Sequence, residues 1–480
     1  MAGEFLRQHG IDIDSEMAKI QFGSTGKKTS EQATRIDVLS NVSLPGTERD
    51  TRWDVHLSDG CIRDVVAHQD DAPPANSVDG KGALLAPSLC HPHIHIDKAY
   101  LLSHPKYADL QVEKGDFQEA MDLTGKAKAQ FENEDLLERG QRLVDESVAA
   151  GVTHMRAFVE VDAGVQLKCL EAGIQLQKRA ADDAVCNIQI CAFAQLPLFS
   201  PSAGDEQGGV IRDLMRQAVA RPGVTVIGST PYVENDREKM QRSVEWMVDL
   251  SIEHNAHLDF HLDYNLDQDV EPLVWFVVQT LKEKGWKDRT SNVTIVLGHC
   301  TRLTLFSEAQ WKELAQTIKD AQLPISFVGM PTSDLFMMRT GKQPEIRGTL
   351  DVPRLIKEYD LNACIGVNNI GNAFTPQGTC DPLSLACQGV GIYQAGTKRD
   401  TEVLYECFST RARAAIGLGR RGVGDTSLAF QPGDPADLLL FQAADPSWRT
   451  RISVSEAVYL YDHGQGRMTI LNGRISRSPQ

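Results

Sequence analysis

Residues 86–98 read APSLCHPHIHIDK, an apolar run that ends in a His-x-His pair. Side chains two residues apart on a β-strand point to the same face, so His93 and His95 would direct two imidazole rings at one point. Imidazole is a common ligand of zinc, iron and nickel. The pattern therefore predicts half of a metal site. The alternative is an edge strand whose two histidines are solvated or hydrogen-bonded.

A regular alternation of strand-like and helix-like segments follows this stretch. Apolar, strand-like runs recur at 153–161, 185–196, 225–233, 257–265, 294–300, 324–331 and 362–369. Amphipathic, helix-like segments separate most of them. With the His-x-His strand this makes eight strands, which predicts an α/β fold, a (β/α)8 TIM barrel. A doubly wound open sheet is the alternative, but no Gly-x-Gly-x-x-Gly follows a strand.

The two ends of the chain have a different pattern from the middle. Short strand-like runs occur near residues 36–42, 53–57, 438–441 and 468–475. We expect these runs to pair into one small β-sandwich formed by both chain ends, with the barrel inserted between them. The predicted organisation is an N-terminal extension (1–34), the first part of the sandwich (35–86), the barrel (87–428) and the second part of the sandwich (429–480).

Composition narrows the class of protein. The 480 residues are 41% hydrophobic and 24% charged, as in ordinary globular proteins. A net charge of −16 disfavours binding to nucleic acid or to an anionic membrane surface. No apolar run is long enough for a membrane span, and the first residues lack the features of a secretory signal. The ten cysteines are scattered, which indicates buried thiols in a reducing compartment and predicts a cytoplasmic location.

Two later strands add histidines to the candidate site. Active sites of such barrels lie at the C-terminal ends of the strands. The fifth strand carries His261, and strand alternation places Asp263 on the same face. The sixth strand ends in His299. Three of the four histidines could hold one metal ion and leave positions open for water, as catalytic sites require. His299 would either bind the metal or hold a substrate atom.

With these residues in view, the chain resembles the amidohydrolase superfamily, and within it the branch of the cytosine deaminases and N-isopropylammelide amidohydrolases. The resemblance rests on the His-x-His-x-Asp motif at 93–97, on His261, on GHCT at 298–301 and on PGDPADLL at 432–439. It extends from about residue 35 to the C-terminal end. It implies a (β/α)8 barrel with a β-sandwich built from both termini.

The resemblance also implies roles for individual residues. His93, His95 and His261 would bind one divalent metal ion, zinc or iron. Gln195 would hydrogen-bond an amide or ring group of a small-molecule substrate, although a buried amide satisfied by backbone is an equal alternative. Asn369 belongs to the loop expected to line the substrate pocket. Members of the family are often oligomers, so a homo-oligomer is a possible assembly.

Two positions depart from the pattern of the family. The family has a metal-binding, proton-accepting aspartate on the eighth strand, where this chain has Asn368. An amide oxygen can contact a metal but cannot accept a proton at neutral pH. The deaminase branch has a glutamate on the fifth strand, where this chain has Tyr264. A phenol, with an unperturbed pKa of about 10, can donate a hydrogen bond but is a poor proton carrier.

We therefore expect a metal-dependent amidohydrolase or deaminase that hydrolyses a C–N bond of a small cyclic amide or amino-heterocycle through metal-activated water. His299 and Tyr264 would orient the water and stabilise the oxyanion, and Asp263 would carry the proton. The alternative is a non-catalytic homologue that binds a ligand or a partner, an interpretation that the replacements at positions 264 and 368 favour.

Overall fold

The computed structural model describes residues 34–70, 74–202, 204–206, 208–341, 343–421, 426–442, 450–464 and 466–478. Residues 35–480 form one unit, and all that follows concerns it. The predicted extension 1–34 lies outside the described residues except for Thr34. None of the helices in these ranges combines the length and the apolarity that a membrane crossing requires.

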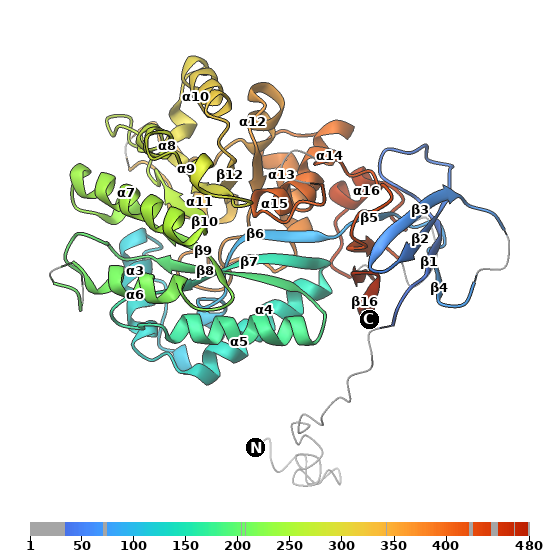
Figure 1. Cartoon of the computed structure of the whole chain (residues 1–480), viewed down its shortest axis with the longest axis horizontal. Helices are drawn as coiled ribbons and strands as arrows, with labels where there is room; N and C mark the ends of the chain where they lie inside the picture. Colours follow the sequence, from blue (N-terminus) through green and yellow to red (C-terminus); the bar gives the residue numbers. More distant parts are fainter. Residues whose placement is uncertain are drawn as a thin grey trace, which may run out of the picture. The chain divides into compact units, whose positions relative to one another are not determined.

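Eight parallel strands form the central sheet in the order in which they follow one another along the chain (Figure 1). They are β6 (Leu89–His95), β7 (Val152–Glu160), β8 (Asn187–Ala194), β9 (Val224–Ser229), β10 (His257–Leu262), β11 (Ile295–His299), β12 (Ile325–Gly329) and β13 (Ala363–Ile365). Their apolar side chains are buried on both faces, as parallel strands covered by helices require.

The last strand returns to the first and closes the sheet. Ile94 forms a parallel bridge with Asn368, three residues beyond β13. The N–H of Asn368 donates to the carbonyl of His93 at 3.1 Å, and the carbonyl of Asn368 accepts from the N–H of His95 at 2.8 Å. The closed sheet confirms the predicted (β/α)8 barrel and excludes the doubly wound open sheet.

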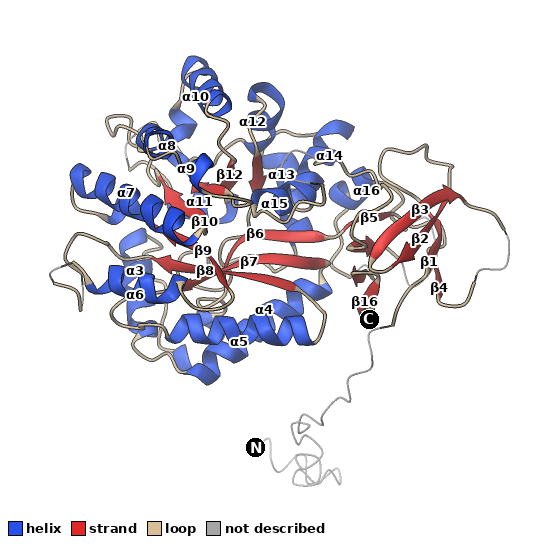
Figure 2. Cartoon of the chain, in the orientation of Figure 1, coloured by secondary structure: helices blue, strands red, loops and turns tan. Residues whose placement is uncertain are grey.

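Helices follow the strands and surround the barrel (Figure 2). They are α3 (Phe117–Lys128), α4 (Asn133–Ala149), α5 (Lys168–Asp182), α6 (Val210–Val219), α7 (Arg237–His254), α8 (Val274–Glu283), α9 (Trp286–Arg289), α10 (Glu308–Asp320), α11 (Pro331–Met337), α12 (Val352–Tyr359), α13 (Pro382–Ile392), α14 (Lys398–Cys407), α15 (Thr410–Ala415) and α16 (Val454–Tyr459).

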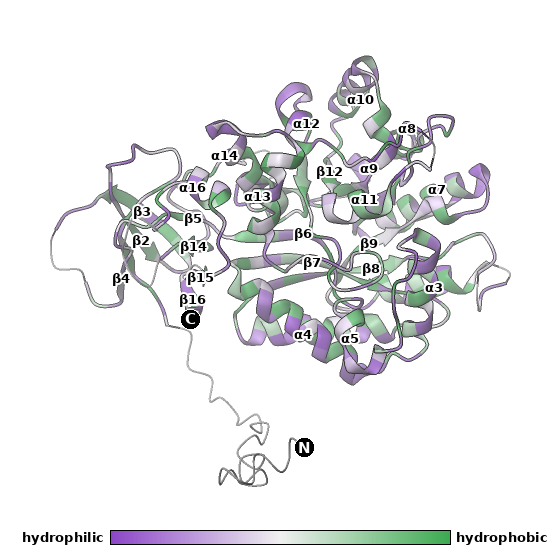
Figure 3. Cartoon of the chain, turned by 180° about the vertical axis from the view of Figure 1, so that it is seen from behind, coloured by the Kyte–Doolittle hydropathy of each residue, from purple (hydrophilic) through white to green (hydrophobic). Residues whose placement is uncertain are grey.

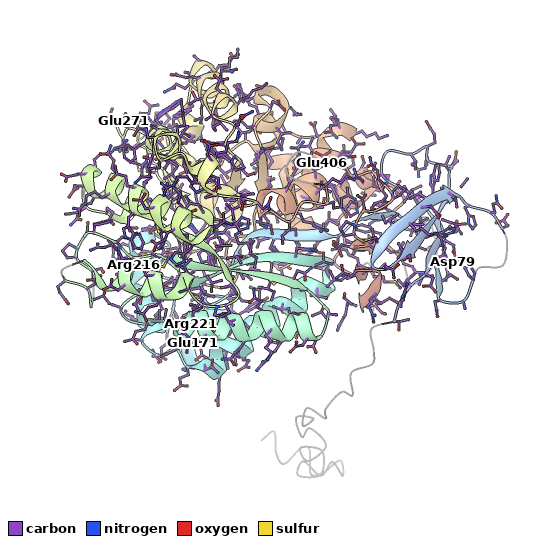
Figure 4. All side chains as sticks on the ribbon, viewed as in Figure 1. Asp79, Glu171, Arg216, Arg221, Glu271 and Glu406 are labelled. Atoms are coloured by element: carbon purple, nitrogen blue, oxygen red, sulfur yellow. The ribbon has the colours of Figure 1, made fainter. Side chains whose placement is uncertain are left out.

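The covering helices are amphipathic. In Figure 3, α4 and α5 carry both hydrophobic and hydrophilic colours. Leu170 and Leu176 of α5 are buried, and a Cβ at Gly173 would lie only 2.9 Å from Val159 of β7, so glycine permits a close approach of helix and strand. The outer surface carries pairs such as Arg221 and Glu171, 3.6 Å apart and labelled in Figure 4. Such exposed pairs add little stability, so the apolar faces hold the helices in place.

Two four-stranded sheets from the chain ends pack beside the barrel. One has the order β3 (Cys61–Ala67), β2 (Trp53–Ser58), β1 (Val38–Val42), β4 (Ser77–Asp79); the other has β16 (Arg474–Arg477), β15 (Met468–Leu471), β14 (Leu438–Leu440), β5 (Leu85–Pro87). Side chains of both sheets share one apolar core, including Leu39, Val55, Leu85, Leu438 and Ile470. This confirms the predicted sandwich formed by both chain ends. The boundaries at residues 86 and 428 stay predictions.

Candidate active site

Three histidines converge at the C-terminal end of the barrel. His93 and His95 come from β6 and His261 from β10. Nε2 of His261 lies 3.1 Å from Nε2 of His93 and 3.1 Å from Nε2 of His95. The three side chains offer ligand atoms that all lie within 4.8 Å of one another, and all three residues are buried. The predicted set of metal ligands is therefore brought together.

The chemistry of these three rings fits a divalent metal ion. Burial lowers the pKa of each histidine well below its usual value, so each ring is neutral. A neutral Nε2 of His261 cannot make a satisfactory hydrogen bond to both neighbours at once, because it has either one proton or one lone pair. Around an ion at the usual histidine distance of about 2.1 Å, neighbouring nitrogens lie roughly 3.0–3.4 Å apart. The observed spacing matches that arrangement.

Aromatic packing holds the histidine rings in their orientations. His93 stacks on Phe158 of β7 with ring centroids 4.0 Å apart, and His261 lies 4.3 Å from Phe193 of β8. Nδ1 of each of the three histidines makes no hydrogen bond within the described part of the chain. Metal-binding histidines usually have such a bond. Here the phenyl rings do the orienting instead.

Asn368 presents an unpartnered oxygen beside the histidines. Its Nδ2 donates to Oγ of Ser333 at 2.7 Å, and Oγ of Ser333 lies 2.6 Å from Oγ1 of Thr375. Because the amide nitrogen is engaged in this way, the buried Oδ1 is left with no hydrogen-bond partner among the residues described. A buried oxygen without a partner is costly unless a ligand satisfies it. This oxygen is a second observation that fits a cation.

His299 ends β11 and is paired with a carboxylate. Its Nδ1 lies 2.8 Å from Oδ1 of Asp334 in α11. Its ring centroid is 4.1 Å from that of Tyr264 and 5.1 Å from that of His261. Sequence reasoning did not identify Asp334. The one feature of the sequence that could have identified Asp334 is its position five residues after the seventh strand, at the end of the barrel where the active site is expected.

Asp263 differs from the prediction. Its two carboxylate oxygens accept the N–H groups of Leu273 at 2.7 Å and Val274 at 3.0 Å, at the start of α8. Strand β10 ends at Leu262, and Asp263 has a left-handed backbone with φ of 48°, so the alternation that would align it with His261 stops one residue earlier. Burial raises the pKa of Asp263 to about 6. This geometry favours a role in positioning α8 over proton transfer.

Gln195 is held by a buried lysine. Nζ of Lys98 lies 3.2 Å from Oε1 of Gln195 and 2.6 Å from Oε1 of Glu160 at the end of β7. The amide oxygen of Gln195 therefore accepts from a side chain and not from the backbone. The predicted contact of Gln195 with a substrate stays a prediction. Oδ1 of Asn369 accepts from Nδ2 of Asn372 at 2.7 Å, which fixes its own loop.

Helix α3 covers the end of the barrel, a feature that the sequence pattern did not predict. At its start, Phe117 contacts three rings from loops that follow β9, β10 and β13, namely Tyr232, Tyr264 and Phe374, with centroids 6.4, 6.2 and 5.8 Å away. At its end, Lys128 pairs with Glu160 and with Asp162. We call residues 117–128 the α3 cover. Lys98, Glu160 and Asp162, near the end of this helix, are buried.

Solved structures share this fold. No family model and no curated protein matches the sequence. The 5-methylcytosine deaminase of Klebsiella pneumoniae, liganded with 5-fluorocytosine, matches with a TM-score of 0.77 and 22% identity over 92% of this chain and 98% of that one. The N-isopropylammelide isopropylaminohydrolase of Burkholderia multivorans matches at 0.70 and 19% identity, over 91% and 97% of the two chains. The atrazine chlorohydrolase of Arthrobacter aurescens, complexed with zinc, matches at 0.64 and 14% identity, over 92% and 96%. At these identities the likeness establishes the fold.

Proposed function

We propose that this protein is a metal-dependent hydrolase of a C–N bond in a small cyclic amide or amino-heterocycle. One observation carries the proposal: three neutral imidazole rings converge at the C-terminal end of the barrel, with Nε2 of His261 3.1 Å from Nε2 of His93 and 3.1 Å from Nε2 of His95. Asn368, whose backbone is hydrogen-bonded to that of His93 and His95, has a buried side-chain oxygen without a hydrogen-bond partner among the described residues. The names of the similar structures, a cytosine-type deaminase and an ammelide aminohydrolase, support this class of substrate.

His93, His95 and His261 would hold one divalent ion, with Oδ1 of Asn368 as a further oxygen ligand. When bound, such an ion lowers the pKa of a water molecule to about 7 and so supplies a nucleophile near neutral pH. Zinc and iron are both compatible with imidazole ligands. The zinc complex of the similar atrazine chlorohydrolase supports zinc as the first ion to test.

The chain itself would bind and orient a flat, polar substrate. Phe117 and Phe374, whose rings are in contact, would offer apolar surface to such a substrate. Tyr264, next to His299, remains a hydrogen-bond donor because burial raises its pKa well above the usual value. It would donate to the oxygen or ring nitrogen that gains negative charge as the C–N bond is attacked. Gln195, held by Lys98, would fix the substrate through its amide.

The cellular setting that we propose is the cytoplasm. All ten cysteines are free thiols, and eight of them are buried. Free thiols persist in a reducing compartment. The partner is a small-molecule substrate, and a homo-oligomer is compatible with this function.

The test combines elemental analysis with an activity screen. The purified protein is expected to hold about one equivalent of zinc or iron and to release ammonia or an amine from members of a panel of amino-pyrimidines and amino-triazines. Chelation should abolish the release, and the ion should restore it. The matched control is His56→Ala, a histidine of β2 in the sandwich. Absence of metal from the protein would overturn the proposal, and so would absence of hydrolysis by the wild type. Hydrolysis that appears only in Asn368→Asp would favour the non-catalytic alternative.

A further inference from the structure

One carboxylate touches a site histidine in the described part of the chain, and it is not on the expected strand. The eighth strand is followed by Asn368, which accepts no proton. Asp263 is committed to the start of α8. Asp259 pairs with Arg156 at 2.7 Å. Asp334, from α11 after the seventh strand, contacts His299.

The surroundings of Asp334 hold its carboxylate in one orientation. The residue is fully buried. Its Oδ1 lies 2.8 Å from Nδ1 of His299, whereas its Oδ2 accepts from the N–H of Met330 at 3.1 Å and from Oγ1 of Thr349 at 2.7 Å. Each oxygen therefore has its own partners, and rotation of the carboxylate would break three hydrogen bonds.

We infer that Asp334 is a positioning residue that fixes His299 in the tautomer with its proton on Nδ1 and with Nε2 free to accept a hydrogen bond in the active site. A carboxylate only accepts hydrogen bonds, so Nδ1 of His299 must be the donor. The one hydrogen bond that the His299 ring makes with the described residues is that of Nδ1 to Asp334, so Nε2 stays available. The inference rests on the proposed function. It adds that Nε2 of His299 accepts the proton that Asn368 cannot accept.

The expected role follows from the position of the ring. The His299 ring lies beside those of His261 and His93, with centroids 5.1 and 6.1 Å away. An acceptor at Nε2 can there receive a hydrogen bond from the attacking water and hold its proton until the leaving nitrogen takes it. The proton thus moves from water to the leaving group, and no other reactant is needed. The carboxylate behind the ring stabilises the imidazolium in between, as in other carboxylate–histidine pairs.

The decisive variant is Asp334→Asn. Met330 and Thr349 both donate to the position of Oδ2, so the amide oxygen of the asparagine must take that place. The amide nitrogen then faces Nδ1 of His299 and donates to it. His299 must carry its proton on Nε2 instead, while side-chain size stays the same. The variant therefore reverses the tautomer without opening a cavity.

The experiment uses zinc-loaded protein with 15N-labelled histidine, and His299→Gln assigns the resonances. In the wild type, the unprotonated nitrogen of His299 is expected to be Nε2; in Asp334→Asn it is expected to be Nδ1. Turnover by Asp334→Asn should slow by about 10²–10⁴-fold in kcat, with little change in KM or zinc content. The matched control is Asp351→Asn at the start of α12, which should leave all four readouts unchanged.

A wild-type His299 protonated on Nε2 would overturn the inference, as would an Asp334→Asn variant with unchanged kcat. The wild-type spectrum decides the question even if the variant fails to fold. The spectrum is also independent of turnover: a protein with the expected tautomer and bound zinc that hydrolyses no heterocycle would contradict the proposed function and leave the positioning role of Asp334 intact.

Discussion

Two sets of residues at the C-terminal end of the barrel differ in how closely they follow the predicted pattern. His93 and His95 on β6 converge with His261 on β10, the strand on the opposite side of the barrel, as predicted. After β12 and β13, the amide of Asn368 stands where the resemblance implies a carboxylate, and a buried carboxylate is present at Asp334, a residue to which the sequence analysis gave no role. Holding a cation and moving a proton are therefore separate tasks, which different strands can perform and which can change independently.

The largest effect is expected from the histidines that would hold the cation. In His261→Ala, the nitrogen that contacts both other histidines is lost. We expect loss of the bound metal and loss of detectable hydrolysis, measured by elemental analysis and amine release. His56→Ala is the control. A His261→Ala protein that keeps a full equivalent of metal would show that the three histidines are a packing cluster.

A smaller effect is expected from Asn368→Asp, at the position after β13. The carboxylate cannot donate to Ser333, so the Ser333–Thr375 pair must reverse or lose a bond, which costs about 1–3 kcal/mol of unfolding free energy. Because His299 and Asp334 already handle the proton, kcat should stay flat or fall. Urea unfolding and steady-state kinetics test this. If kcat instead rose by about 10²-fold or more, the result would show that His299 and Asp334 do not supply the proton acceptor that Asn368 lacks.

Phe117→Ala tests whether the α3 cover affects substrate binding alone or also the metal site and the proton transfer. The side chain contacts rings from three loops, and each aromatic pair contributes about 0.5–1.5 kcal/mol. We expect KM to rise roughly two- to tenfold, with kcat and metal content nearly unchanged. Gln118→Ala, on the exposed side of the same helix, is the control. A large fall in kcat would show that Phe117 organises the reacting groups themselves.

The smallest effect on the site is expected from a histidine at the opposite end of the barrel. His154 lies near the start of β7, hydrogen-bonded to Thr153 and Asn187, and burial lowers its pKa to about 3. It is neutral when folded and gains a proton on unfolding below about pH 6.5. It therefore destabilises the fold as the pH falls from about 6.5 towards 3, by up to about 1.4 kcal/mol per pH unit.

In His154→Gln, urea midpoints measured between pH 7 and pH 4 should fall less steeply than in the wild type, and the metal content should be unchanged. Loss of metal from this variant would mean that the position of a histidine along the strand does not determine its role. An unaltered slope would mean that His154 is already protonated in the folded protein.

The sequence predicted the fold because the fold depends on periodic features. Eight apolar runs with helical segments between them identify the barrel, and a spacing of two brings His93 and His95 to one face. The polar details depend on backbone geometry that composition does not reveal. Asp263, His299 and Asn368 all adopt a left-handed backbone where their strands end, with φ of 48°, 64° and 69°. Because each such turn redirects the side chain, strand alternation does not predict the direction of the side chain at these three site positions.

The partnership of Asp334 with His299 could not be predicted for a related reason. The two residues are 35 positions apart, and nothing in the composition of the segment after β12 distinguishes a buried acceptor from an ordinary helix-start aspartate. The α3 cover depends on contacts with rings from three separate loops, which no local pattern records.

The α3 cover would affect how the protein acquires the metal ion that we propose. Phe117 at one end and Lys128 at the other hold the helix over histidines that solvent barely reaches. Comparable covers open on timescales of microseconds to milliseconds, and a chelator can reach the ion only during such openings. Exchange should then become independent of chelator concentration once capture outpaces reclosure. The opening rate of the cover would therefore set the upper limit on the rate at which one ion can be exchanged for another.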